Sequence, residues 1–125
     1  MIFTFGDSWT AKWQGYRPWP ELLDKPSKNF AAAGSGNKQI LDQVSEASLD
    51  YPDEEVEAVV VAFTSIARLT LNMSLNMELC IALHPDYPWY ESVQKKVFEE
   101  AGLKNLLHQS FYTFHAIESI VNQTW

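Results

Sequence analysis

The chain has 125 residues and a formal net charge of −7, and 46% of its residues are hydrophobic. This length suits a single domain with a sizeable core, so we expect one domain over residues 1–125. The negative charge argues against nonspecific nucleic-acid binding, which needs clustered lysines and arginines. No apolar stretch approaches the length of a membrane span, and the first residues are strand-like rather than a signal peptide. We therefore expect neither nucleic acid nor membrane as a partner.

The cysteine and histidine content bears on compartment and metals. Cys80 is the one cysteine, so no internal disulfide can form, which suits a reducing cytoplasm. We expect the cytoplasm of a bacterium or of a virus-infected host cell. His108 and His115 would share one face of a helix, but a zinc site needs further ligands that we cannot identify. We expect no metal and no cofactor.

The N-terminal residues predict a strand followed by a tight turn. The apolar run Ile2–Phe5 leads directly into Gly6, Asp7 and Ser8. Glycine permits such a turn, and a serine at the start of a helix lies near N–H groups that favour developing negative charge. Several hydrolase folds display a nucleophile in this way. An ordinary strand-to-helix turn with Ser8 as the N-cap accounts for the same residues.

A second apolar stretch and a helix follow. Residues 30–33 are apolar and run into the glycine-rich turn 34–36, which predicts a second strand and a loop. After this turn, four apolar residues share one face of a predicted helix: Ile40, Leu41, Val44 and Ala47.

The third predicted strand, Ala58–Phe63, ends in polar Thr64 and Ser65, with Arg68 close behind. If the three strands are parallel, their ends share the sheet edge where open α/β folds bind ligands. Ser8, Gly34 and Thr64 would then converge.

At this point the chain resembles the SGNH (GDSL) hydrolase family. Gly6-Asp7-Ser8-Trp9 is similar to the first family block, which carries the nucleophilic serine. Residues 29–37 are similar to the second block, and Gly34 best matches its oxyanion-hole glycine. The strand ending before Thr64 resembles the third block of a phage-like branch. The resemblance covers residues 1–70 approximately and depends more on block order than on any single block.

The resemblance implies a site and a fold. Ser8 would be the nucleophile, and the oxyanion hole would be formed by Ser8, Gly34 and Thr64. Ligand contacts would come from Asp7, Trp9, Asn37, Ser65 and Arg68, although Asp7 could instead cap the turn. The implied fold is a small three-layer α/β/α domain of flavodoxin-like, SGNH type. It would have a short parallel sheet of about three strands and C-terminal helices.

The chain departs from the family pattern at two places. The asparagine of the usual Gly-x-Asn-Asp block is replaced by Thr64 or Ser65, and no Asp-x-x-His pair supplies the base. His108 follows Asn105 at the family spacing, with asparagine in place of aspartate, and His84 lies in a proline-rich segment. Either histidine is a candidate base. Without a base within hydrogen-bond reach, a serine hydroxyl is a poor nucleophile at neutral pH.

The C-terminal half predicts helices and no fourth strand. We expect helices over residues 72–83, 89–101 and 103–121, with Gly102 as a stop between the last two. A three-stranded sheet leaves exposed edges, so homo-oligomerisation is a further hypothesis.

Two functions follow as hypotheses. The first is a shortened SGNH-like protein with weak or no esterase activity that serves as a binding or structural module. The second is an active serine esterase or acyl hydrolase that uses Ser8. The sequence leaves open whether the protein is an enzyme. In either case the ligand would be a small ester or a carbohydrate-like molecule.

Overall fold

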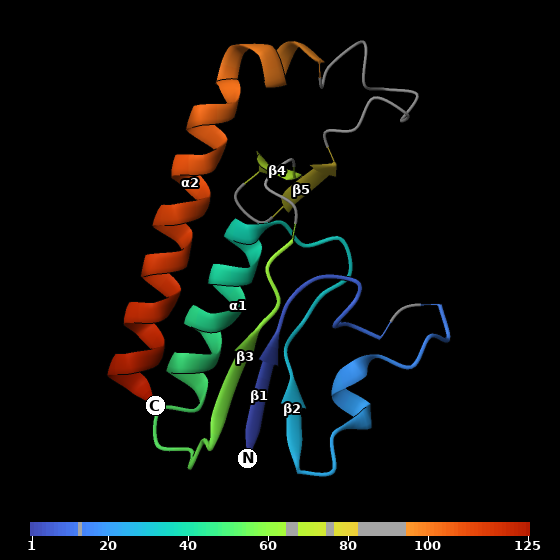
Figure 1. Ribbon diagram of the computed structural model, residues 1–125, viewed down its shortest axis with the longest axis vertical. Coiled ribbons are helices and arrows are strands. Elements are labelled where there is room, and N and C mark those ends of the chain that lie inside the picture. The colour runs from blue at the N-terminus through green and yellow to red at the C-terminus, as the bar shows by residue number, and fades with distance from the viewer. Residues whose placement is uncertain (13, 65–67, 75–76, 83–94) are drawn as a thin grey trace.

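A computed structural model describes residues 1–12, 14–64, 68–74, 77–82 and 95–125. Three parallel strands form the central sheet in the order β2-β1-β3 (Figure 1). They are β1 (Ile2–Phe5), β2 (Ser27–Asn29) and β3 (Ala58–Val61). The expected short parallel sheet is therefore confirmed, and the fold is mixed α/β. Within the described residues, no helix is both long and apolar enough to span a membrane.

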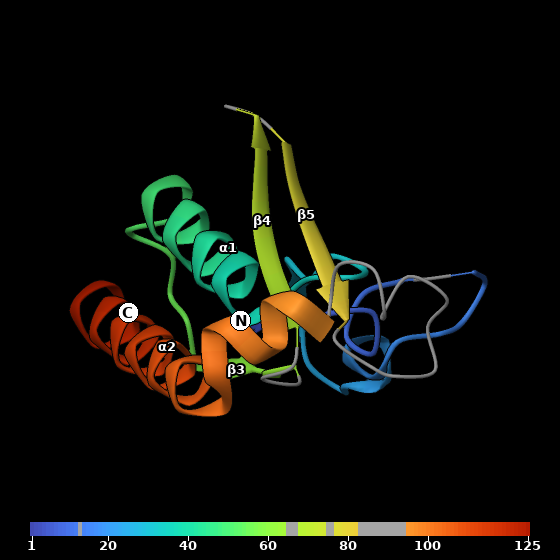
Figure 2. The same ribbon diagram turned by 90° about the horizontal axis from the view of Figure 1, so that it is seen from above.

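Two helices cover one face of this sheet. They are α1 (Asn37–Asp50) and α2 (Lys95–Thr124), which run alongside each other in Figures 1 and 2. The alternation of β1 turns Phe3 and Phe5 toward them, where both rings are fully buried. From α1 and α2, four residues pack on these rings as buried members of the core: Ile40, Val44, Ala47 and Ile117. The predicted apolar face of α1 is confirmed.

The chain between β1 and β2 covers the opposite face. Thr4 points there, fully buried, and its Oγ1 donates to Asn29 Oδ1 at 3.1 Å. Asn29 Nδ2 donates to the carbonyl of Thr10 at 2.7 Å, and the indole N–H of Trp19 donates to Thr10 Oγ1 at 3.2 Å. Trp19 opens the short 3-10 helix η1 (Trp19–Leu22), in which Pro20 is buried. A polar network thus satisfies the buried side chains on this face.

An aromatic cluster joins the end of the chain to the sheet. The Trp125 ring meets the rings of Phe3 at 5.1 Å and Phe5 at 6.4 Å, and its Nε1 donates to the carbonyl of Tyr51 at 2.8 Å. Phe30, which directly follows β2, also stacks on Phe5, with ring centroids 5.0 Å apart. Aromatic pairs add to the stabilisation from apolar burial, so this cluster fixes α2 against β1.

The second strand is shorter and earlier than expected. The prediction of a strand through the apolar residues 30–33 is wrong, because β2 ends at Asn29. Asn29 Oδ1 accepts the N–H of Ala31 at 3.1 Å, which folds the chain into a side-chain-stabilised turn. Phe30 and Ala32 still donate N–H groups to the carbonyls of Thr4 and Gly6, at 2.9 and 3.2 Å. The loop therefore stays beside β1 without continuing as a strand.

The prediction of a helix over residues 72–83, and of no fourth strand, is also wrong. The strands β4 (Arg68–Ser74) and β5 (Met77–Ala82) form an antiparallel hairpin, in one register from Arg68↔Ala82 to Asn72↔Glu78 and shifted at Ser74↔Met77. Residues 68–74 alternate polar and apolar types, a strand period that the apolar content of 72–83 concealed. Figure 2 shows this hairpin projecting away from the three-stranded sheet, with which it does not pair.

The expected break at Gly102 is confirmed. Gly102 has φ 71° and ψ 146° within α2, so the helical path is interrupted there. Residues 89–94 of the expected preceding helix lie outside the described residues, and the following helix continues to Thr124.

Replacing Trp125 by alanine should lower the free energy of unfolding by about 3 kcal/mol, because the ring contacts and the hydrogen bond to Tyr51 are lost together. Urea denaturation measures this loss. Leu49→Ala is the control, since Leu49 is 80% exposed and its truncation should change the stability by less than about 0.5 kcal/mol. Equal losses for the two variants would show that the cluster does not anchor α2.

Candidate functional site

The turn after β1 is held by Asp7. Its backbone carbonyl accepts the N–H groups of Thr10 and Ala11, at 3.0 and 2.8 Å. Its side-chain Oδ1 accepts the N–H of Trp9 at 3.1 Å, which is the capping role that the sequence allowed. The expectation that a helix begins at Ser8 is wrong, because residues 8–10 form a turn that leads into a loop. The chain that follows Ser8 therefore supplies no helix N-terminus at this serine.

Gly6 makes this turn sterically possible. A Cβ at Gly6 would lie 2.6 Å from Thr10 Oγ1 and 3.1 Å from the Cβ of Ala62, and the residue adopts φ +157°. Thr10 is fully buried and Ala62 follows β3, so neither neighbour can move away easily. The glycine thus brings the end of β1 into close contact with the chain after β3.

Gln43 of α1 fixes the same glycine from the helix side. Its Oε1 accepts the N–H of Gly6 at 3.1 Å, and its Nε2 donates to the carbonyl of Gly6 at 3.2 Å and to Ser35 Oγ at 3.0 Å. One side chain therefore ties together the loops that follow β1 and β2. Sequence reasoning missed Gln43, although its place beside the buried stripe of α1 was a usable signal.

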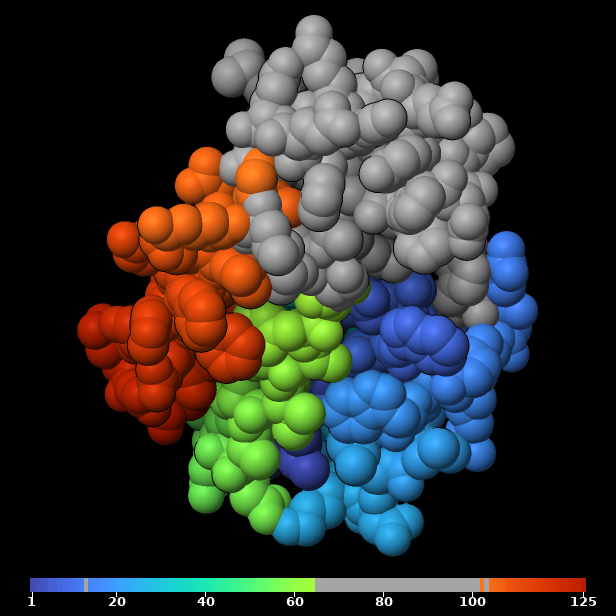
Figure 3. All heavy atoms as spheres, turned by 45° about the horizontal axis from the view of Figure 1, so that its top comes forward, coloured from blue at the N-terminus to red at the C-terminus, as the bar shows by residue number. Residues whose placement is uncertain are grey.

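Asn37 holds the end of β3 in the same manner. Its Oδ1 accepts the N–H of Thr64 at 2.9 Å, and its Nδ2 donates to the carbonyl of Thr64 at 3.2 Å. Asn37 was expected to contact a ligand, and Thr64 to contribute to an oxyanion hole. The structure brings the two residues together, with the backbone of Thr64 bonded to Asn37. The hydrogen bonds of Gln43 and Asn37 thus bring the three loops together at the carboxyl-end edge of the sheet, as expected for parallel strands. Figure 3 shows the green segment that contains β3 in contact with the dark blue N-terminal segment.

The N–H groups of Ser8 and Gly34 are among the backbone donors at this edge for which the described residues show no acceptor. Ser8 is half-buried, while Gly34 is exposed and adopts φ +84° in the loop before α1. An oxygen atom of a ligand is the kind of partner to which such N–H groups donate.

The aromatic residues near Ser8 divide into two kinds. Trp9 is 72% exposed and Tyr16 is 50% exposed, so both present ring surface to solvent. The indole N–H of Trp19 is instead bonded to Thr10 Oγ1, on the face of the sheet opposite α1 and α2. Trp9 is one of the residues expected to contact a ligand, and it is more exposed than Tyr16.

The described histidines lie on α2, where His108 and His115 are exposed. The ring Nδ1 of His115 lies 3.4 Å from Glu118 Oε2, and within the described part of the chain neither histidine bonds to Ser8. His84 and Ser65 lie outside the described residues, and Arg68 is described as the first residue of β4. No group of three or more potential metal ligands occurs in the described part of the chain.

Comparison of this chain with protein-family models, curated proteins and solved structures found no match. The resemblance to SGNH hydrolases stays a prediction from the sequence blocks that contain Ser8, Gly34 and Thr64.

Alanine at Gly6 should lower the free energy of unfolding by about 3 kcal/mol, because its Cβ cannot fit beside Thr10 and Ala62. Gly34→Ala is the matched control. No atom lies within 4 Å of a Cβ built there, so only the left-handed backbone opposes the substitution, at about 1 kcal/mol. Thermal or urea unfolding of both variants checks this order, and a larger loss for Gly34→Ala would contradict it.

Gln43→Leu keeps the approximate volume but leaves the N–H and carbonyl of Gly6 without their partner. The free energy of unfolding should fall by about 2 kcal/mol, the typical penalty for unsatisfied buried polar groups. Gln109→Leu, at an exposed position on α2, should be nearly neutral. Denaturant titration of both variants is the measurement. A neutral Gln43→Leu would show that the hydrogen bonds between Gln43 and Gly6 do not stabilise the turn.

Proposed function

We propose that the chain is a shortened SGNH-like module that binds a small ligand at the carboxyl-end edge of its sheet and does not hydrolyse esters. The strand order β2-β1-β3 agrees with the start of the flavodoxin-like order, which supports a three-layer domain of that type. The sequence blocks around Ser8, Gly34 and Thr64 follow these three strands in turn. Their shared edge is where such folds bind ligands.

The observation that carries this proposal is the engagement of the Thr64 N–H by Asn37 Oδ1 at 2.9 Å. An oxyanion hole works through donors aimed at the charge that develops in the transition state. The backbone N–H of Thr64 is already bonded within the protein, so Thr64 could join such a set only through its hydroxyl. The Ser8 and Gly34 N–H groups remain to hold a carbonyl or anionic oxygen, which suits binding more than turnover.

The ligand class follows from the surroundings of these donors. The Trp9 ring, 72% exposed and adjacent in sequence to Ser8, offers a flat apolar surface beside polar hydrogen-bond donors. Sugar rings and small esters both present an apolar face together with oxygen acceptors. A carbohydrate-like molecule or a small ester is therefore the proposed ligand.

The distribution of histidines also favours binding over hydrolysis. Serine catalysis needs a base within hydrogen-bond reach of the hydroxyl. His115 pairs with Glu118 on the exposed surface of α2, and the hollow beside His108 is lined by other α2 residues, Phe111, Tyr112 and His115. Esterase activity at Ser8 would require another base, for which His84 is the candidate.

A fluorophosphonate probe distinguishes the two functions. Because Ser8 lacks an activating base in this proposal, the folded wild-type protein should remain unlabelled, as should Ser8→Ala, when intact mass is measured after incubation. A known serine hydrolase labelled in parallel shows that the probe is active. Stoichiometric labelling of the wild type that Ser8→Ala abolishes would establish an activated serine and overturn the non-catalytic proposal.

A further inference from the structure

The strand β3 lies at an edge of the central sheet, and no strand among the described residues pairs with its outer side. The N–H of Ala62 donates to the carbonyl of Phe5 at 2.9 Å, and alternate residues of a parallel strand face the same neighbour. The backbone groups of Val59 and Val61 therefore point away from β1. Free N–H and carbonyl groups on a strand edge are a template for another strand.

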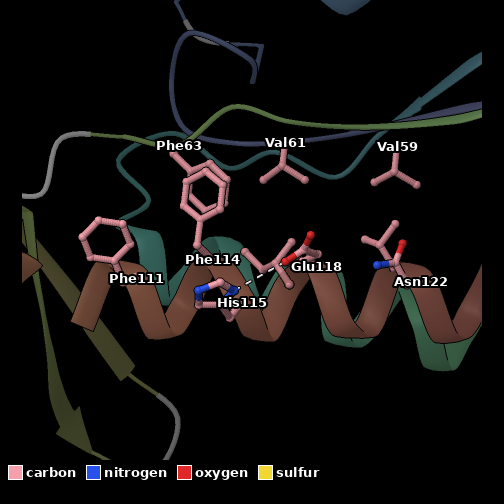
Figure 4. Close-up of a pocket in the computed structure, with 10 residues that line it drawn as sticks. Val59, Val61, Phe63, Phe111, Phe114, His115, Glu118 and Asn122 are labelled. Atoms are coloured by element: carbon pink, nitrogen blue, oxygen red, sulfur yellow. Dashed lines mark hydrogen bonds and ion pairs between the residues drawn. The ribbon is translucent and has the colours of Figure 1, made fainter. Parts of the chain in front are cut away.

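A hydrophobic groove lies beside this edge. It has a volume of about 530 Å³ and runs between β3 and α2 (Figure 4). In Figure 4 the side chains of Val59, Val61 and Phe63 point toward α2, and the Phe63 and Phe114 rings stack with centroids 3.8 Å apart. Phe111 is 62% exposed and Phe114 is 52% exposed, so α2 leaves much of this surface uncovered. Exposed apolar surface of this kind marks interaction sites.

Acidic residues precede β3 in the chain, and one lines the α2 side of the groove. Asp53, Glu54 and Glu55 precede β3 and are exposed, and they form no ion pair among the described residues. Glu57 is different, because Lys25 forms a salt bridge with it and lowers the pKa of its carboxyl. Glu118 adds a carboxylate on the α2 side, where its partner is His115.

We propose that the free edge of β3 and the adjoining groove bind an extended segment of another protein as a fourth strand. Its backbone would bond to Val59 and Val61, alternate hydrophobic side chains would enter the groove, and flanking lysines or arginines would meet Asp53, Glu54 and Glu55. Recognition by strand addition works in this way. This inference is independent of the ligand site at Ser8.

The charge distribution selects this occupant over a second copy of the chain. Each copy carries a formal net charge of −7, so self-association brings two negative molecules together. A basic segment instead gains from the acidic residues before β3 during encounter and in the complex. The apolar β3 residues Ala58–Val61 carry no charge that would oppose such pairing.

The first probe is a fluorescein-labelled peptide of sequence Lys-Lys-Val-Thr-Val-Thr-Val-Thr-Lys. We expect saturable binding by fluorescence anisotropy and new hydrogen-exchange protection at the Val59 and Val61 amides. A peptide with glutamates in place of the lysines should bind at least about tenfold more weakly because of repulsion. A peptide with prolines in place of the threonines should not bind, since proline removes ladder donors.

Variants of the protein locate the binding surface. Phe111→Ser, and separately the double charge reversal Glu54→Lys with Glu55→Lys, should each weaken peptide binding about tenfold. The matched controls lie on α1, where the side chains concerned are exposed: Leu49→Ser, and separately the double charge reversal Glu46→Lys with Asp50→Lys. Both should bind the peptide as the wild type does. Circular dichroism verifies the fold of every variant, and the two groove variants test the surface independently.

Three results would overturn the proposal. They are no saturable binding of the lysine-flanked peptide, equal binding of the glutamate-flanked peptide, and a dimer that already protects the Val59 and Val61 amides without peptide. The last result, seen by light scattering together with hydrogen exchange, would assign the edge to a second copy of the chain. Labelling at Ser8 by a fluorophosphonate probe would leave this inference untouched.

Discussion

The structure depends on burying β1 on both faces. This four-residue strand has a neighbour on each side, and Phe3, Thr4 and Phe5 are all fully buried. Because side chains alternate along a strand, one face needs apolar cover and the other needs partners for a hydroxyl. The helices supply the first, and the loop between β1 and β2 supplies the second. The helices and this loop also contact the segments that follow the strands, and these contacts position the ends of the strands.

The ends of the strands are fixed by polar side chains of α1 rather than by the sheet alone. Gln43 engages Gly6 and Ser35, and Asn37 engages Thr64, so one helix holds the loops after all three strands. The hydrogen bonds satisfy backbone N–H and carbonyl groups that would otherwise lack partners where the strand pairing ends. An edge built in this way is well ordered before any ligand arrives, which lowers the entropy lost on binding. The same bonds also engage the backbone N–H of Thr64, so this donor is already satisfied within the protein.

The elements that the sequence predicted are those with a strong local signal. The buried stripe of α1, the valine-rich strand and the break at Gly102 each follow from periodicity or from the backbone freedom of glycine. The end of β2 depends instead on the Asn29 side chain bonding to Thr4, Ala31 and Thr10, and two of these contacts join residues 19 and 25 positions apart. The hairpin was missed because an apolar segment of that length fits a helix or a strand equally. At the site, Asp7 was predictable as a cap, whereas the roles of Asn37 and Gln43 required knowing which loops α1 would meet.

The two proposed binding surfaces use different parts of the same sheet. The Ser8 edge collects the ends of strands and offers N–H groups to a small molecule, while the side of β3 offers a continuous backbone edge and an apolar groove to a chain. The second surface exists because the sheet ends at β3 among the described residues, whereas the first forms at the strand ends of any open parallel sheet. A fourth strand within the domain would cover Val59 and Val61 and extend the core over Phe111 and Phe114. The hairpin that follows β3 leaves the sheet instead, so the edge is left for a partner to complete. Because no further strand of the described chain covers it, the edge of β3 is exposed and can pair with a strand of another protein.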